Sequence, residues 1–215
     1  MCRLLGIQSD QKKDYRELTR DFADMCQNNS KWQGDGWGIL YFTDGEWKEY
    51  KSITPIWEER EVIDELPEFQ RGLVFARLAF RKETIAIKHT QPYISEKLVF
   101  AFNGNLRGVK IKSAGKIGAE KIYSQLLERY PEFDLQTALD KIVEKLINNS
   151  RDPKAINIIA MDDTSMVGSC NYWENSQYHT MQFTKNSHEQ IICSEPLPGY
   201  SWEHFSNHQS IQFVY

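Results

Sequence analysis

Short apolar runs dominate the first half of the chain, and each is typical of a strand. The predicted strands cover residues 3–8, 36–42, 46–51, 72–80 and 97–102. The second and third runs flank Thr43-Asp44-Gly45, where the glycine can supply a positive φ. This pair therefore predicts a β-hairpin.

Helical periodicity appears in three segments. Apolar residues repeat at intervals of three and four over 14–28 and again over 117–127. Asp134 can cap a third helix over 135–146. Strands are predicted again at 155–161, 166–170, 178–184, 190–193 and 210–214. Strands, then a helix pair, then strands predict an α+β fold with mainly antiparallel sheets and helices on the outer faces.

Composition excludes several classes of protein. The chain has 215 residues, a formal net charge of −4 and 26% charged residues, so it has enough apolar side chains for a sizeable core. Its pI near 5.8 argues against nucleic-acid or anionic-membrane partners. No apolar run approaches the roughly 20 residues of a membrane span, and the apolar N-terminal stretch is too short for a signal peptide. We expect one cytoplasmic domain over residues 1–215, since no linker divides the chain.

Metal and phosphate motifs are weak. His204 and His208 would share a helix face, but the intervening residues lack the glutamate of a zinc-protease motif. Gly34–Gly38 is glycine-rich without fitting a phosphate-binding loop, which favours a tight turn before a strand. Of the four cysteines, Cys26, Cys170 and Cys193 are expected to be buried hydrophobes. We expect no metal and no cofactor.

Cys2 differs from the other cysteines because of its position. Removal of Met1 would place a free α-amine beside the Cys2 thiol. An α-amine has a pKa near 7.7–8, so it can take the thiol proton and activate the nucleophile without a histidine. The plain alternative is a chain that begins with Met-Cys by chance.

Two other features fit an attack on an amide. Asn103-Gly104 follows the apolar run ending at Phe102, where we expect a strand to open into a turn with two donors for an oxyanion. The alternative is an ordinary Asn-Gly turn. Arg77 interrupts an apolar strand, so it needs an anionic partner, either a structural acid or a substrate carboxylate.

Six segments in chain order resemble the class II glutamine amidotransferases, a family with N-terminal nucleophiles (Ntn hydrolases) and a four-layer αββα sandwich of two mainly antiparallel sheets. They are MCRLLG at 1–6, GDGWGI at 34–39, FARLAF at 75–80, HTQPY at 89–93, FNGN at 102–105 and CSEPL at 193–197, followed by Trp202. The last segment is similar to the stand-alone branch of the family.

The resemblance implies a role for four residues, and two more are candidates for the substrate site. Cys2 would be the nucleophile with its own amine as base, and Asn103 and Gly104 would form the oxyanion hole. Arg77 would hold the α-carboxylate of glutamine. Trp37, in the GDGWGI segment, is a further substrate-binding candidate. Glu120, near the start of the 117–127 helix, is a candidate to hold the substrate α-ammonium.

The sequence also departs from the family pattern. Gly118 stands where the family has the aspartate that holds the glutamine α-ammonium, and three family histidines become Phe75, Gln91 and Phe102. Losing that carboxylate removes a charge-assisted hydrogen bond of about 1.5–3 kcal/mol.

Two functions are therefore open. The first is an amidohydrolase that cleaves glutamine or a γ-glutamyl amide through a Cys2 thioester, with any ammonia acceptor site on a synthase partner. The second is a catalytically impaired homologue that serves as a binding or partner subunit. The substrate and the oligomeric state do not follow from the sequence.

Overall fold

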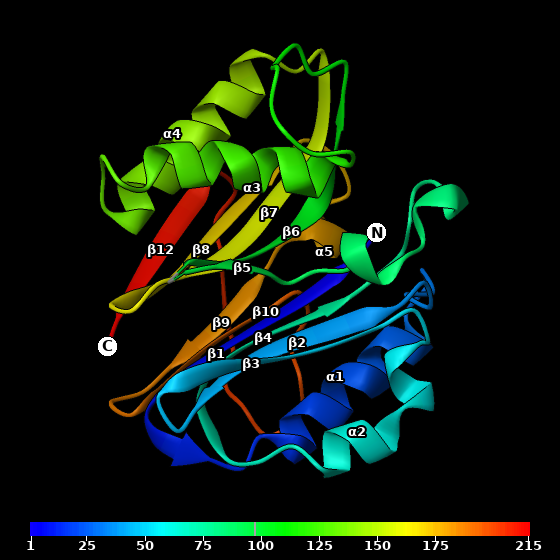
Figure 1. Ribbon diagram of the computed structural model, residues 1–215, viewed down its shortest axis with the longest axis vertical. Coiled ribbons are helices and arrows are strands. Elements are labelled where there is room, and N and C mark those ends of the chain that lie inside the picture. The colour runs from blue at the N-terminus through cyan, green and yellow to red at the C-terminus, as the bar shows by residue number, and fades with distance from the viewer. Residues whose placement is uncertain (97) are drawn as a thin grey trace.

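Two antiparallel sheets face each other at the centre of the molecule, and helices cover their outer faces (Figure 1). The computed structural model describes residues 1–96 and 98–215. The strands are β1 (Arg3–Lys13), β2 (Trp37–Thr43), β3 (Glu46–Ser52), β4 (Phe69–Ala76), β5 (Tyr93–Ser95), β6 (Leu98–Arg107), β7 (Asp152–Met161), β8 (Ser165–Tyr172), β9 (Gln182–Lys185), β10 (Glu189–Cys193), β11 (Glu203–His204) and β12 (Gln209–Val214). The helices are α1 (Arg16–Asn28), α2 (Arg60–Asp64), α3 (Gly118–Arg129), α4 (Leu135–Asn148) and α5 (Ser176–His179), with 3-10 turns η1 (Ile56–Glu58), η2 (Lys82–Thr84) and η3 (Ile87–His89).

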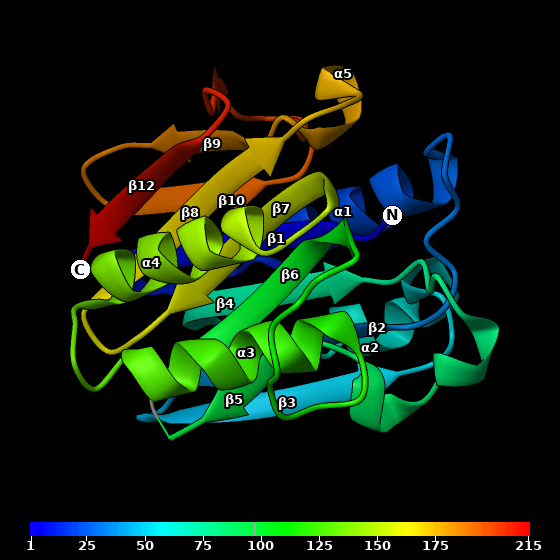
Figure 2. The same cartoon turned by 90° about the horizontal axis from the view of Figure 1, so that it is seen from above.

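The layers follow the order helix, sheet, sheet, helix. One sheet has the strand order β11-β9-β10-β1-β4-β2-β3, and α1 and α2 lie under it; the other has the order β12-β8-β7-β6-β5, and α3 and α4 lie over it (Figures 1 and 2). Three apolar cores separate the layers, and the middle one, between the sheets, includes Leu4, Leu73, Ile159 and Met166. This is the α+β, four-layer αββα sandwich predicted from the sequence.

The helices form where the apolar periodicity predicted them. In α1, Leu18, Phe22 and Cys26 are buried along one face. Helix α4 begins after Asp134, whose carboxylate accepts a hydrogen bond from the backbone N–H of Thr137 at 3.0 Å. This bond satisfies one of the free donors of the first turn, so the predicted cap is confirmed.

The predicted hairpin is also present. Strands β2 and β3 pair in the register Thr43↔Glu46, and Asp44 and Gly45 both have positive φ. Two positive φ values in a two-residue loop match the right-handed twist of the flanking strands.

Among the predicted strand ends that differ from the structure, two bear on the site. The strand predicted over 72–80 ends at Ala76, because neither neighbour extends further: Ala76 pairs with Arg3, where β1 begins, and with Trp37, where β2 begins. The strand predicted to end at Phe102 runs on to Arg107, because β7 offers it partners that far.

The C-terminal third contains two smaller corrections. The strand predicted over 178–184 is the end of α5 followed by β9. His204 lies in β11 and His208 has a φ of 62° in a turn, so the two histidines do not share a helix face. Among residues 1–96 and 98–215, no helix is long and apolar enough to cross a membrane.

Candidate active site

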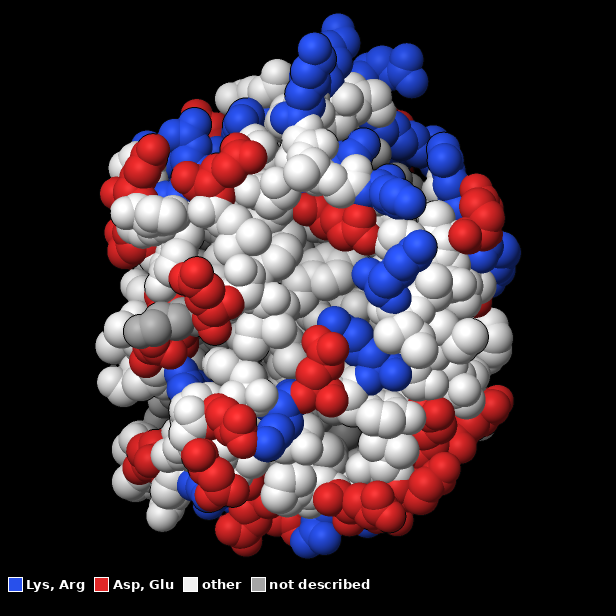
Figure 3. Space-filling model, in the orientation of Figure 1, with Lys and Arg blue, Asp and Glu red and all other residues white. Residues whose placement is uncertain are grey.

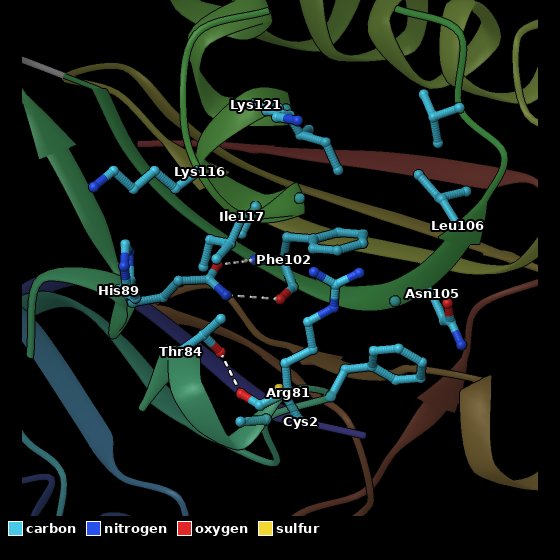
Figure 4. Close-up of a pocket in the computed structure, with 18 of the residues that line it drawn as sticks. Cys2, Arg81, Thr84, His89, Phe102, Asn105, Leu106, Lys116, Ile117 and Lys121 are labelled. Carbon is cyan, nitrogen blue, oxygen red and sulfur yellow. Dashed lines mark hydrogen bonds between the residues drawn. The ribbon is translucent and has the colours of Figure 1, made fainter. Parts of the chain in front are cut away.

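A cavity of about 730 Å³ opens where the start of β1, the end of β4, the middle of β6 and the start of α3 come together. Figure 4 shows Cys2 and Arg81 at its lower side, Phe102 on the β6 wall, and Ile117, just before α3, and Lys121 of α3 above. These elements belong to both sheets and to one outer layer, so the sandwich itself assembles the cavity.

Cys2 lies at the base of this cavity and is only partly buried, unlike the other three cysteines, which are buried as predicted. Its sulfur is held by one residue, since the backbone N–H of Leu78 donates to Sγ at 3.4 Å and the thiol donates to the Leu78 carbonyl at 3.6 Å. Burial raises the pKa of the Cys2 thiol, while the Leu78 hydrogen bond and the nearby Arg77 and Arg3 charges oppose that rise. A neighbouring base is therefore needed to form the thiolate.

The residue before Cys2 is anchored in the structure. The carbonyl of Met1 accepts hydrogen bonds from the Tyr178 hydroxyl at 2.7 Å and from the Gln33 side-chain amide at 3.2 Å. Burial lowers the pKa of the Met1 amine to about 6. While Met1 is present, the Cys2 nitrogen is part of a peptide bond and cannot act as a base.

Arg77 follows β4 directly instead of lying inside the strand. Arg77 is 4% exposed. Its Nη2 donates to the Thr84 carbonyl at 2.8 Å and to the Thr84 hydroxyl at 3.0 Å. Nη1 is buried without a hydrogen-bond partner, and no ion pair joins Arg77 to any described acid. A buried guanidinium with an unused donor at a cavity wall is suited to an anionic ligand.

The glycine-rich turn positions the segment after Arg77. Backbone bonds join Asp35 N–H to the Arg77 carbonyl and Arg77 N–H to the Gly36 carbonyl. The Asp35 carboxylate accepts from Ala79 N–H at 2.8 Å and from Lys82 Nζ at 2.7 Å. Asp35 was not singled out in the sequence, because its partners lie more than 40 residues away.

Asn103 and Gly104 lie inside β6, so the predicted turn is replaced by a strand. Phe102 N–H bonds the Gln91 side chain at 2.6 Å, and Gln91 Nε2 donates to the Phe102 carbonyl at 3.1 Å. Gln91 therefore takes the place of a neighbouring strand on the edge of β6 that faces away from β7. Because the edges alternate, Gly104 N–H points to this same edge, two residues on, where Gly104 lines the cavity.

Asn103 does not line the cavity, although its neighbours Phe102 and Gly104 do. The residue is 1% exposed, and neither its amide nitrogen nor its carbonyl oxygen has a hydrogen-bond partner. Leaving such a group unsatisfied costs about 1–3 kcal/mol. Stability alone therefore does not explain an asparagine at this position.

Comparison with known proteins finds matches in structure but not in sequence. No protein-family model matches the chain, and no curated protein matches it. A glutamine aminotransferase class-II domain protein from Silicibacter pomeroyi has a TM-score of 0.70 at 13% identity, with 99% of this chain and 95% of that chain covered. A predicted glutamine amidotransferase from Pseudomonas aeruginosa PA01 has a TM-score of 0.63 at 14% identity, with 99% and 97% covered.

A larger enzyme matches over part of its length. The glutamine phosphoribosylpyrophosphate amidotransferase from B. subtilis has a TM-score of 0.70 at 14% identity, with 99% of this chain covered. This chain spans 47% of that enzyme. The chain has the fold of the class II glutamine amidotransferases.

Within the amidotransferase fold, Trp37 does not lie where a substrate could reach it. Its side chain is fully buried in the core between the first sheet and α1, and its indole N–H donates to Glu59 Oε2 at 2.7 Å. Residues alternate between the two faces of β2, and Trp37 points to the face away from the cavity. The predicted contact between Trp37 and substrate is therefore wrong.

Glu120 is engaged in structural contacts. Its carboxylate accepts from Lys116 N–H at 2.7 Å, bonds His89 Nδ1, and lines a separate cavity of about 390 Å³. Burial opposes its ionisation, but these donors together lower the pKa of Glu120. The carboxylate thus caps the start of α3, and the predicted role on a substrate ammonium has no support from its position.

The remaining departures from the family pattern also lie at the cavity of this amidotransferase fold. Phe75, Gln91 and Phe102 all line it. Gly118 lines it as the first residue of α3, and a Cβ placed there would have no atom within 4 Å. Among the described residues, no group of three or more His, Cys, Asp or Glu side chains could hold a metal ion.

Proposed function

We propose that the protein is an amidohydrolase of the class II glutamine amidotransferase type, acting on a γ-glutamyl-type amide. The observation that carries this proposal is the accessible Cys2 thiol at the base of a cavity whose wall holds an unpartnered Arg77 donor. The buried, unpartnered Asn103, which lies between the cavity-lining residues Phe102 and Gly104 in the sequence, supports the same proposal.

The proposed reaction begins after Met1 has been removed. The free Cys2 amine takes the thiol proton, and the sulfur attacks the amide carbon to give a tetrahedral intermediate. Gly104 N–H and the Asn103 amide stabilise the oxyanion. The C–N bond then breaks, and the leaving amine takes the proton from the Cys2 ammonium. Water, activated by the same amine, hydrolyses the thioester and regenerates the thiol.

The substrate carboxylate is proposed to bind Arg77, whose second donor is unused. A synthase that accepts the released ammonia remains a possible partner, since the matched B. subtilis amidotransferase is about twice as long as the matching region. We propose the cytoplasm as the compartment because all four cysteines are free thiols.

One observation favours the alternative, a non-catalytic partner subunit. The Met1 carbonyl is bound by Tyr178 and Gln33, so the unprocessed chain has a well-defined place for its first residue. A protein that keeps Met1 has no base for the mechanism above.

Two measurements test the proposal. Intact-mass spectrometry of the natively produced protein is expected to show Met1 removed. Ammonia release from glutamine and from N-acylated glutamines is expected to disappear in Cys2→Ala and to persist in Cys26→Ala, a buried thiol in the core under the first sheet. Equal activity in wild type and Cys2→Ala would exclude the mechanism, and quantitative retention of Met1 would favour the partner subunit.

A further inference from the structure

The charges that line the Cys2 cavity are all of one sign. Its lining includes five cationic residues, Arg77, Arg81, Arg107, Lys116 and Lys121, and no Asp or Glu among the residues that the structure describes. The whole chain has a net charge of −4, so this is a local arrangement and not a general basicity. Figure 3 shows Lys and Arg side chains on the upper right of this face, over the segment between β6 and α3.

The cations occupy two levels. Arg77 is buried at the base, on the same segment as the Leu78 backbone that holds the Cys2 sulfur. The other four side chains are exposed at the mouth, and Figure 4 shows the Arg81 guanidinium directed toward the β6 wall beside Phe102. One negative group near the reacting carbon and another at the mouth would match these two levels.

The cations are largely unneutralised. Arg107 reaches Asp152 only at 4.0 Å between exposed side chains, and no ion pair joins Arg81, Lys116 or Lys121 to a described acid. Two buried or half-buried acids of adjoining segments are engaged elsewhere: Asp35 with Lys82, and Glu120 with His89 and the start of α3.

A zwitterionic ligand fits this lining poorly. All charged side chains that line the described cavity are cations, so an ammonium group there would be repelled and would find no carboxylate among them to accept its hydrogen bonds. In the first turn of α3, where a side chain could carry such a carboxylate, Gly118 has no side chain and leaves open space.

We infer that the substrate is an anionic amide without an ammonium group, which carries one carboxylate for Arg77 and a second negative group for the cations at the mouth. An acylated α-nitrogen is the simplest chemistry that meets this description. The inference rests on the proposed function, because it names the substrate class of the same site.

A charge series of glutamine derivatives tests it. Glutamine, N-acetylglutamine and N-succinylglutamine keep the same amide and have net charges of about 0, −1 and −2. In the wild-type protein, kcat/KM is expected to rise roughly tenfold from glutamine to N-acetylglutamine and to rise again for N-succinylglutamine. The second increase is expected to become smaller as salt is added, because salt screens exposed charges. A wild-type preference for glutamine over N-acetylglutamine would overturn the inference.

Gly118 offers a matched pair of variants. Gly118→Asp adds a carboxylate to the cavity without a clash and is expected to raise kcat/KM for glutamine by roughly ten- to a hundredfold, through a charge-assisted hydrogen bond. Gly118→Asn, with a neutral side chain of the same shape, is expected to keep the wild-type order. Equal effects of the two variants would contradict the charge argument.

The contribution of a cation at the cavity mouth can be compared with that of a lysine outside the cavity. Lys121→Gln is expected to lower kcat/KM for N-succinylglutamine roughly two- to fivefold. Lys110→Gln removes an exposed charge that does not line the cavity and is expected to have no such effect.

A binding measurement separates this inference from the proposed function. The Cys2→Ala protein keeps the cavity but has no nucleophile, so calorimetric titration with the three compounds reports recognition alone. The affinity order N-succinylglutamine, N-acetylglutamine, glutamine supports the inference even if no amide is hydrolysed. The reverse order, or no binding of any of the three, would overturn it.

Discussion

At the scale of single residues, Asn103 and Asn157 differ in whether their side-chain amides have hydrogen-bond partners. They are directly opposite each other on β6 and β7, and both are buried. Asn157 donates to the His179 carbonyl at 2.6 Å and accepts from Asn171 N–H at 3.2 Å. Asn103 has no partner for either amide atom.

The same substitution should therefore have opposite consequences at the two positions. Asn103→Ala is expected to lower kcat by about 10²–10³ through loss of an oxyanion donor, with little change in the free energy of unfolding. Asn157→Ala is expected to cost about 1–3 kcal/mol of stability. Urea unfolding and initial rates on the two variants measure both quantities. A loss of stability in Asn103→Ala as large as in Asn157→Ala would show that Asn103 is structural.

At the scale of elements, the edge of β6 depends on one side chain from another segment. Gln91 bonds both the N–H and the carbonyl of Phe102 and so extends the β6 edge beyond Phe100, where the pairing with β5 begins at Tyr93. Gly104 lies two residues along this edge, so the orientation of its N–H depends on the same contact.

Gln91→Leu is expected to lower stability by about 2 kcal/mol, because two buried backbone groups lose their partners. It should also lower kcat, since the β6 edge loses its support beside Gly104. Gln190→Leu, on a strand of the other sheet with an exposed side-chain bond, is expected to change stability by less than about 0.5 kcal/mol. Unchanged kcat in Gln91→Leu would separate the edge contact from catalysis.

The elements that were predicted correctly depend on residues close in the sequence, and those that were predicted wrongly depend on residues far apart in it. The 43–45 hairpin and the Asp134 cap depend on residues within three positions of one another, so the sequence contains them. The ends of β4 and β6 depend on how far strands from distant parts of the chain extend. For this reason the local structure at two candidate residues was predicted wrongly: Arg77 follows β4 instead of lying in it, and Asn103 lies in β6 instead of a turn.

The candidate site follows the same division. Cys2, Asn103, Gly104 and Arg77 were proposed from residue type and order. Cys2, Arg77 and Gly104 line the cavity, and Asn103 precedes Gly104 in β6 without lining it. Trp37 was misassigned because a tryptophan beside a glycine turn gives no sign of which sheet face it occupies. Gln33, Asp35 and Tyr178 were missed because each acts on a backbone or side chain that is remote in sequence.

At the scale of the whole molecule, the region behind the N-terminus contains a buried histidine that should make folding pH-dependent. His179 is 3% exposed and its Nδ1 has no partner. Burial, followed by the nearby charges of Lys31 and Arg3, lowers the pKa of His179 to about 4. An unfolded histidine titrates near 6.5, so the unfolded chain binds more protons between these two values.

Stability is therefore expected to be fully present above about pH 6.5 and to fall by up to about 3 kcal/mol as the pH is lowered toward 4. His179→Gln should remove most of this loss, whereas His204→Gln, at an exposed position, should retain it. Urea unfolding between pH 4 and pH 7 measures the slopes. Parallel curves for wild type and His179→Gln would contradict the assignment.

The central position of β1 has a consequence for the order of events during synthesis. Its first residues pair with Val74–Ala76 on one side and with Cys193 on the other, and Arg3 forms an ion pair with Glu195. The ribosome reaches those last partners only after roughly 10–40 s, at about 5–20 residues per second. Until then the first residues lack their final neighbours, and an aminopeptidase has access to Met1. Tyr178 and Gln33 then bind the Met1 carbonyl and leave the first residue partly buried. If the proposed mechanism holds, the fraction of active protein would depend on how much Met1 is removed before these contacts form.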